Sequence, residues 1–211
     1  MSNEQGTSGT RTGRPPLSER RKAATRMDIA RQAVRLFTTK GLAATTAEEI
    51  AEAAGVSLRT LWRYCPGTGK ESYVLPLLST GIDTVARFLT EQEPGEALTG
   101  LLAEPPHSAE QDEVATMLAL VRLTHTEPEV RAVWLRAHRD AEPVFAASIA
   151  ERSGFSPEEL TVKTEAAMLN AALRVAVEHS AELAPSPERA GPVLREALRD
   201  ALRTLPGGLR S

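Results

Sequence analysis

Residues 46–66, TAEEIAEAAGVSLRTLWRYCP, are the stretch of sequence that decides the fold. Thr46 and Glu49 have the spacing of a capping box, so a helix is predicted to begin here. Gly55 suits the positive φ of a tight turn, and Ala51 is small enough for two helices to cross closely. The apolar residues expected to clamp the two helices together are Ile50, Ala54, Val56, Leu61 and Tyr64. This pattern indicates a helix-turn-helix.

The second helix of this motif, predicted over 58–64 with Ser57 as its N-cap, is expected to enter the major groove of DNA. Its outward side chains are Arg59, Thr60, Trp62 and Arg63. Arginine can bond guanine with two hydrogen bonds, and a threonine methyl group can contact a thymine methyl. The alternative interpretation is that these arginines are merely solvated.

The amino-acid composition indicates that the rest of the chain is helical as well. The 211 residues are 41% hydrophobic and only 4% aromatic, with alanine and leucine abundant and no long alternation of apolar and polar residues. We therefore expect an all-α protein, with an N-terminal three-helix domain and a larger helical domain for ligand binding and dimerisation. The expected division is a disordered basic arm over 1–24, the helix-turn-helix domain over 25–72 and the helical body over 73–205.

Charge is distributed unevenly along the sequence. Residues 1–80 contain 12 Lys/Arg and 7 Asp/Glu, whereas residues 81–211 contain 13 and 21. The basic first part favours a polyanionic partner for that part alone. One cysteine excludes an internal disulfide and a cysteine-based zinc site. The absence of a signal peptide or a long apolar run predicts a cytoplasmic protein without a membrane span.

Helical periodicity predicts further elements on both sides of the motif. A first helix is expected from Ser18 or Thr25 to about Thr39, ended by Gly41. Helices of the body are expected at about 70–91, 96–103, 109–125, 128–153, 157–180 and 187–205. Pro143 lies inside one of them and is expected to kink or split it.

Residues 25–66 resemble the DNA-binding domain of TetR-type regulators. The matching residues are Thr25, Arg26, Ile29, Ala33, Leu36, Phe37, Gly41, Thr46, Ile50, Ala51, Ala54, Gly55, Val56, Ser57, Thr60 and Leu61. The resemblance implies a homodimer that binds double-stranded operator DNA and senses a small molecule. It also implies phosphate contacts by Thr46, Ser57 and Trp62, with Arg59, Thr60 and Arg63 nearest the bases.

The sequence departs from the family pattern after this motif. Trp62 stands where the family usually has tyrosine, and Cys65 where it usually has phenylalanine. Lys70 is the candidate for the family's phosphate-binding lysine, although the segment before it is about two residues longer. Cys65 is expected to be an inert thiol, with a redox sensor as the alternative. Arg14 either reaches into an A·T-rich minor groove or belongs to an ordinary basic tail.

The body is expected to provide a dimer interface and an effector pocket. The second half of the helix over 157–180 is apolar nearly all round and the last helix carries an apolar stripe, so the two predict a four-helix interface between subunits. The interface leucines are predicted to be Leu169, Leu173, Leu194, Leu198 and Leu202. The candidate pocket residues are Phe88, Met117, Leu120, Val121, Trp134, His138, Phe145 and Met168. Ordinary core packing is the alternative for each of these. His125 is a further polar candidate.

The sequence as a whole predicts a ligand-responsive transcriptional regulator. We expect it to act as a repressor that a small, largely apolar effector releases from its operator. A constitutive DNA-binding protein without a ligand is the alternative. An enzyme is not expected, because the sequence has no Gly-rich phosphate loop, nucleophile elbow, histidine metal pair or convincing acid/base pair. No cofactor is expected either.

Overall fold

The computed structural model describes residues 17–67, 69–91 and 108–205, and every regular element within these ranges is helical. The head consists of α1 (Leu17–Lys40), α2 (Ala47–Ala53) and α3 (Leu58–Tyr64). A short 3-10 helix, η1 (Lys70–Val74), leads into the body. The body consists of α4 (Leu75–Glu91), α6 (Ser108–Leu123), α7 (Pro128–Ser153), α8 (Leu160–Leu183) and α9 (Pro187–Arg203). The predicted all-α class is confirmed.

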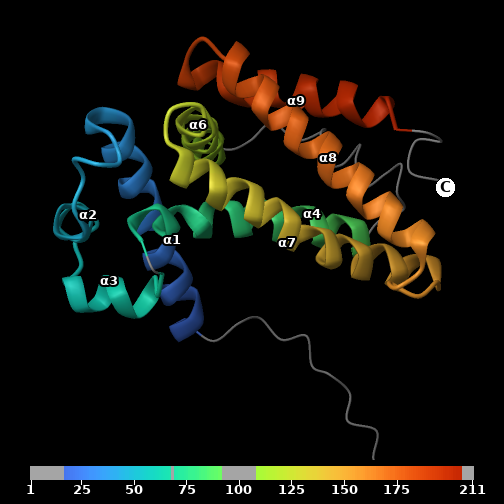
Figure 1. Ribbon diagram of the computed structural model, residues 1–211, viewed down its shortest axis with the longest axis horizontal. Coiled ribbons are helices and arrows are strands. Elements are labelled where there is room, and N and C mark those ends of the chain that lie inside the picture. Colours follow the sequence, from blue (N-terminus) through green and yellow to red (C-terminus); the bar gives the residue numbers. More distant parts are fainter. Residues whose placement is uncertain (1–16, 68, 92–107, 206–211) are drawn as a thin grey trace, which may run out of the picture.

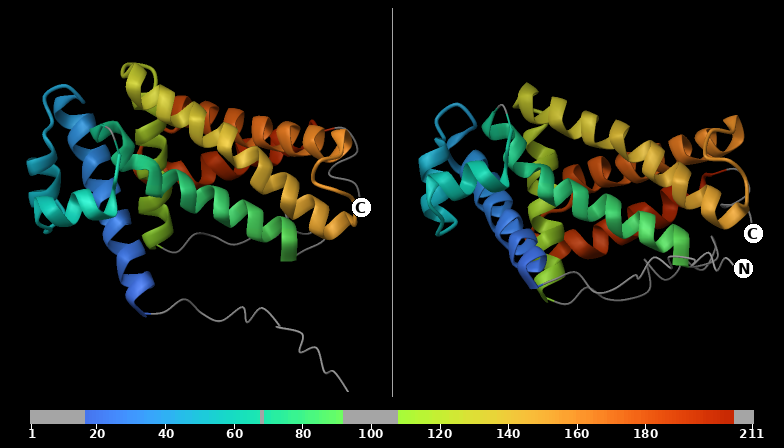
Figure 2. Two further views of the ribbon diagram at one scale, coloured as in Figure 1. Left: turned by 60° about the horizontal axis from the view of Figure 1, so that its bottom comes forward. Right: turned by 90° about the horizontal axis from the view of Figure 1, so that it is seen from below.

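The head lies at one end of an elongated helical body (Figure 1). Within the body, α7 packs between α4 and α8, and α8 packs along α9. Figure 2 shows α4 running from the head along the body beside α7. Helix α6 packs against α1 of the head as well as α8 and α9. The first helix of the head is therefore held directly by the body.

The head is formed as the helix-turn-helix pattern predicts. Gly41 ends α1 with φ 85°, and Gly55 forms the turn between α2 and α3 with φ 65°, both in the left-handed region that favours glycine. Ile50 and Leu61 are fully buried, and Ala51 is 3% exposed. The other three predicted clamp residues, Ala54, Val56 and Tyr64, are partly buried against the same core.

Helix α1 begins earlier than the predicted domain boundary. It starts at Leu17, one residue before the earlier of the two predicted helix starts, so residues 17–24 of the expected disordered arm are helical. This segment is rich in residues with high helix propensity, and Lys22 pairs with Glu19 one turn away. The remaining arm residues, including Arg14, lie outside the described part of the chain, as does the helix predicted over 96–103.

Helix α7 continues through Pro143 without a break, so the expected split does not occur. Proline removes one backbone hydrogen bond, which leaves the carbonyl of Arg139 without its helical partner. Pro143 and Arg139 both lie on the exposed face of α7, where water can solvate that carbonyl.

Within the described ranges, no helix is both long and apolar enough to cross a membrane.

Candidate DNA-binding surface and effector cavity

Helix α3 presents its predicted base-reading face to solvent. Arg59, Trp62 and Arg63 are exposed, and the Trp62 side chain is 56% exposed. Thr60 is half-buried on the same helix. A large aromatic side chain costs free energy when it is left in water, so its exposure beside two cations favours a surface that a partner covers.

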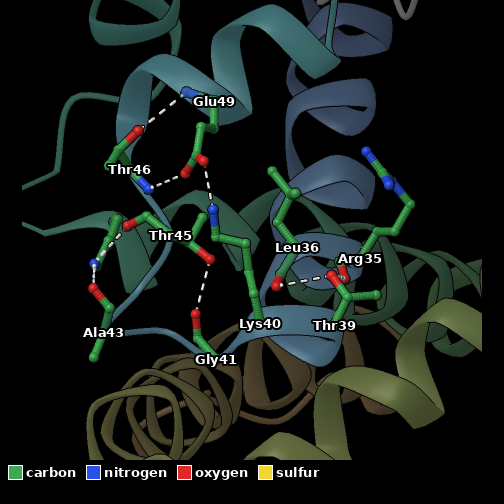
Figure 3. Close-up of polar contacts among 10 residues, drawn as sticks. Arg35, Leu36, Thr39, Lys40, Gly41, Ala43, Thr45, Thr46 and Glu49 are labelled. Carbon is green, nitrogen blue, oxygen red and sulfur yellow. Dashed lines mark hydrogen bonds and ion pairs between the residues drawn. The ribbon is translucent and has the colours of Figure 1, made fainter.

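The N-termini of both motif helices are held by side-chain caps. The Ser57 hydroxyl accepts a hydrogen bond from the Thr60 amide at 3.2 Å, and the two hydroxyl oxygens lie 2.9 Å apart. At α2, the Thr46 hydroxyl accepts from the Glu49 amide, and the Glu49 carboxylate accepts from the Thr46 amide (Figure 3). The predicted capping box is confirmed, and a cap of this kind stabilises its helix by about 1 kcal/mol.

The C-terminus of α3 is anchored to α1. Arg26 donates from Nε to the backbone carbonyl of Tyr64 at 3.0 Å, so its cation lies where the helix dipole is negative. Arg63 folds over the Tyr64 ring, with 4.7 Å from the guanidinium carbon to the ring centroid, and donates to the phenol oxygen at 3.2 Å. Arg63 therefore has a partner within the protein, whereas no described side chain bonds Arg59.

Lys70 has a role in this structure that the family resemblance does not imply. Its ammonium donates to the backbone carbonyls of Ala43 at 3.1 Å and Thr45 at 2.6 Å. These contacts hold the loop between α1 and α2 against η1, so Lys70 positions the motif in the free protein. Its implied phosphate contact stays a prediction.

Cys65 is buried and burial raises the pKa of its thiol, which favours the inert thiol over the redox sensor.

A cavity of about 590 Å³, partly open to solvent, lies between α4, α6, α7, α8 and α9, and Met27 of α1 also contributes to its lining. Met117, Trp134 and Phe145 lie among its lining residues, as the sequence predicts, together with His138. Its volume lies within the range of small-molecule sites, about 300–1,000 Å³. The cavity can therefore accommodate a drug-sized ligand.

A polar network lies on the α7–α8 wall of this cavity. Asn170 donates from Nδ2 to the His138 carbonyl at 2.9 Å, which fixes the orientation of its amide. The Asn170 Oδ1 oxygen lies 2.8 Å from His138 Nδ1, so this ring nitrogen donates and Nε2 is left as an acceptor in the neutral ring. Trp134 packs edge-on against the His138 ring and donates to Glu178 at 2.9 Å.

Several predicted pocket residues lie elsewhere. Leu120 and Val121 are buried in the core shared by the head and body. They lie on the same face of α6 as Met117 but one turn farther along the helix, beyond the part that lines the cavity. Met168 is 37% exposed on the outer face of α8. His125 is exposed in the turn after α6. The side chain of Phe88 lies outside the described part of the structure.

The predicted interface leucines point inward instead of outward. Leu169, Leu173 and Leu202 are at most 7% exposed and belong to the core between α7, α8 and α9. Leu194 and Leu198 line the interior cavity. Because a residue buried within one subunit cannot contact a second, Leu169, Leu173 and Leu202 do not form an interface surface. Leu194 and Leu198 are half-buried and face the cavity, not the groove on the outer side of α9.

The outer surface of α8 and α9 carries a different apolar set, which we call the α8–α9 face. It surrounds a groove of about 990 Å³. Val175 is 52% exposed at its centre and Leu183 is 57% exposed toward one end. The other apolar members are Met168, Ala171, Ala172, Val193, Ala197 and Ala201. Exposed apolar side chains gathered on one face favour contact with a partner.

Comparison with known proteins identifies the family. Residues 29–68 match the family model described as "Bacterial regulatory proteins, tetR family". Residues 92–210, more than half of the chain, match the model of the "MftR C-terminal domain". The chain belongs to the TetR family of transcriptional regulators. The resemblance seen in residues 25–66 is thereby confirmed.

Individual relatives agree with this assignment to the TetR family. The HTH-type transcriptional regulator TcmR of Streptomyces glaucescens is 30% identical over 149 residues, which span 66% of this chain and 65% of that relative's length. A transcriptional regulator from Aquifex aeolicus VF5 has a similar structure, with a TM-score of 0.52, 17% identity, and coverage of 85% of this chain and 98% of that one. A TetR-family regulator from Rhodococcus sp. gives a TM-score of 0.51 at 19% identity, covering 84% and 98%. The two structures show the fold alone.

Sequence reasoning missed two polar groups in the TetR-family body. Asn170 interrupts the otherwise apolar second half of α8, and Arg195 lies on α9 among the cavity leucines. A single polar residue in an apolar run was the available signal for Asn170. No comparable signal identified Arg195, because an arginine on an amphipathic helix is ordinary in sequence.

Burial of His138 makes stability depend on pH. Burial lowers the pKa of His138 from its ordinary value of 6.5, although the Asn170 hydrogen bond opposes this shift. The unfolded chain therefore binds a proton in a pH range where the folded protein does not, and stability rises with pH across that range. We expect the free energy of unfolding in urea to fall as the pH drops below about 6.5. The His138→Gln variant should lack this part of the pH dependence, and equal pH profiles for both proteins would contradict the assignment.

Proposed function

We propose that this TetR-family regulator is a repressor that acts in the cytoplasm, binds operator DNA as a homodimer and is released by a small, largely apolar effector. The observation that carries the DNA half is the exposed set Arg59, Trp62 and Arg63 on a helix capped at both ends. In this proposal Arg59 and Thr60 contact bases, while Thr46, Ser57 and Trp62 contact phosphates. Arg63 lies next to the bases once its contact with Tyr64 opens.

The effector half rests on the cavity and its connection to the head. Leu77, Leu78 and Ile82 of α4 line the cavity, and α4 follows the head directly through η1. Glu113 also lines the cavity and pairs with Arg31 of α1. A ligand that displaces these groups would move the head relative to the body. The cavity therefore favours a ligand-responsive regulator over the constitutive alternative.

The homodimer is proposed through the α8–α9 face. A twofold pair of these faces would bury Val175 against its symmetry mate and form a four-helix interface. Two heads held in this way would reach half-sites about 34–36 Å apart, one turn of the duplex. An effector that changes this spacing weakens operator binding without touching α3. For a tenfold loss of DNA affinity, the effector needs to bind the released form of the protein more tightly than the DNA-bound form by only about 1.4 kcal/mol.

The Arg59→Ala variant tests the base-reading assignment. We expect it to lose about 1–3 kcal/mol of operator affinity and to accept more bases at one position of each half-site. Fluorescence anisotropy with an operator duplex and its single-base variants measures both effects. Arg136→Ala is the matched control, because Arg136 is an exposed arginine on α7, outside the helix-turn-helix. If Arg59→Ala behaves like the control, α3 does not read bases through this residue.

A further inference from the structure

Arg195 is a charged residue that lines the effector cavity, and no residue in the described part of the chain forms a hydrogen bond or ion pair with its side chain. It lies on α9, and its Nη1 atom is buried with no hydrogen-bond partner among the described residues. No described carboxylate forms an ion pair with it. A buried donor on a charged group costs free energy when it stays unsatisfied. An acceptor group that binds beside Arg195 in the cavity could satisfy this donor.

The other charged groups around the cavity do not supply that acceptor. Glu113 is the one carboxylate among its described lining residues, and it pairs with Arg31. Glu196 and Asp200 of α9 lie on the opposite side of the helix, at the α8–α9 groove. Arg87 adds a second, exposed cation to the lining. Among the described side chains that line the cavity, the two arginines therefore outnumber the one carboxylate.

The rest of the wall restricts the remainder of the ligand. Met117, Trp134, Phe145 and Val177 present apolar surface. Asn170 already bonds the His138 ring and donates to the His138 carbonyl and the Glu142 carboxylate. Most of a bound molecule would therefore contact apolar side chains, while one end meets a guanidinium.

Building on the proposed function, we infer that the effector is an amphipathic organic acid whose anionic group binds Arg195. A carboxylate or sulfonate oxygen accepts from the guanidinium, and charge-assisted bonds of this kind are the stronger class of hydrogen bond. The apolar part lies against Met117, Trp134 and Phe145. The effector is then a largely apolar compound that carries a single acidic group.

Two fluorescent probes with the same apolar skeleton test this assignment in the full-length protein. 8-Anilinonaphthalene-1-sulfonate carries an anionic group, and N-phenyl-1-naphthylamine lacks it. We expect Arg195→Met to raise the dissociation constant of the sulfonate by about tenfold or more and that of the neutral amine by less than about threefold. Arg195→Lys should retain part of the preference, because the positive charge remains.

The control variant is Arg199→Met, one turn farther along α9, where the side chain is exposed and lines neither the cavity nor the groove. It should leave both dissociation constants unchanged. The chain has two tryptophans, so a Trp62→Phe background isolates energy transfer from Trp134 in the cavity wall. Efficient transfer from Trp134 shows that a probe binds to the body, although the α8–α9 groove is only one helix diameter away. A Val85→Trp variant, which narrows the cavity and leaves the groove unchanged, should weaken binding of a probe that lies in the cavity.

The outcomes separate this inference from the proposed function. If both probes enter the cavity and Arg195→Met weakens them equally or not at all, the acidic-effector inference is overturned while the effector cavity stands. If neither probe receives energy from Trp134, the cavity takes no ligand of this size, and the effector half of the proposed function fails with it. Selective loss of the sulfonate supports both.

Discussion

Replacing Val175 with aspartate should convert the protein to monomers and lower its operator affinity by about 100-fold or more. Val175 is 52% exposed at the centre of the α8–α9 face, so the substitution leaves the interior of the subunit untouched. In a twofold interface the change occurs twice, and each buried carboxylate without a partner costs several kcal/mol. A monomer contacts only one half-site, which accounts for the loss of DNA binding.

Sedimentation velocity at micromolar concentration and operator anisotropy measure the two consequences. Val144→Asp is the matched control, since Val144 is 40% exposed on α7, outside both the cavity and the groove. It should remain dimeric and bind the operator normally. If the Val175→Asp variant stays dimeric, the interface does not lie on the α8–α9 face. If the parent protein is itself monomeric, the proposed homodimer is contradicted.

Replacing Phe37 with alanine should cost about 3–5 kcal/mol of unfolding free energy. Phe37 is 1% exposed in the core of the head, where it is among the largest fully buried side chains. The free energy of unfolding of a domain is only about 5–15 kcal/mol. A loss of this size should therefore allow the helix-turn-helix to unfold near physiological temperature. DNA binding should then fall along with thermal stability.

Urea denaturation followed by circular dichroism measures this loss. Phe155→Ala provides the same change of side chain at a site that is 60% exposed after α7, and it should change stability by less than about 0.5 kcal/mol. Equal losses for the two variants would show that the core of the head is not packed around Phe37.

Local sequence signals determined most of the head. The Thr46–Glu49 capping box, the Gly55 turn and the Ser57 cap depend on residues within one or two helical turns of one another, so they could be predicted from sequence. The same holds for the exposure of Arg59 and Trp62, which follows from helical periodicity once Leu61 is placed in the core.

The orientation of the body helices could not be predicted in this way. An apolar stripe such as Leu194, Leu198 and Leu202 shows that α9 buries one face, but not whether its own subunit or a partner covers that face. In the structure these leucines cover the interior, and Val175 belongs to the outer surface. Around Met168, helix α8 carries small and apolar residues on several faces, so tertiary packing alone decides which way Met168 points.

The engagement of Lys70 likewise depends on tertiary structure. Its carbonyl partners, Ala43 and Thr45, lie 27 and 25 residues away in sequence, and no local pattern brings them together. The unpartnered Nη1 of Arg195 is another property of packing rather than of sequence. The structure of the head could therefore be predicted from short-range sequence patterns. The lining of the cavity could not, because it depends on how the helices pack together.

Selection of random duplex DNA by the full-length protein, in parallel with Arg59→Ala, tests the central claim most directly. The account predicts that the parent protein enriches an inverted repeat whose half-sites lie about one helical turn apart, or a multiple of it. It also predicts that Arg59→Ala enriches the same repeat with one position per half-site relaxed. Enrichment of no sequence, or of an identical motif by both proteins, would contradict a regulator that reads its operator through α3.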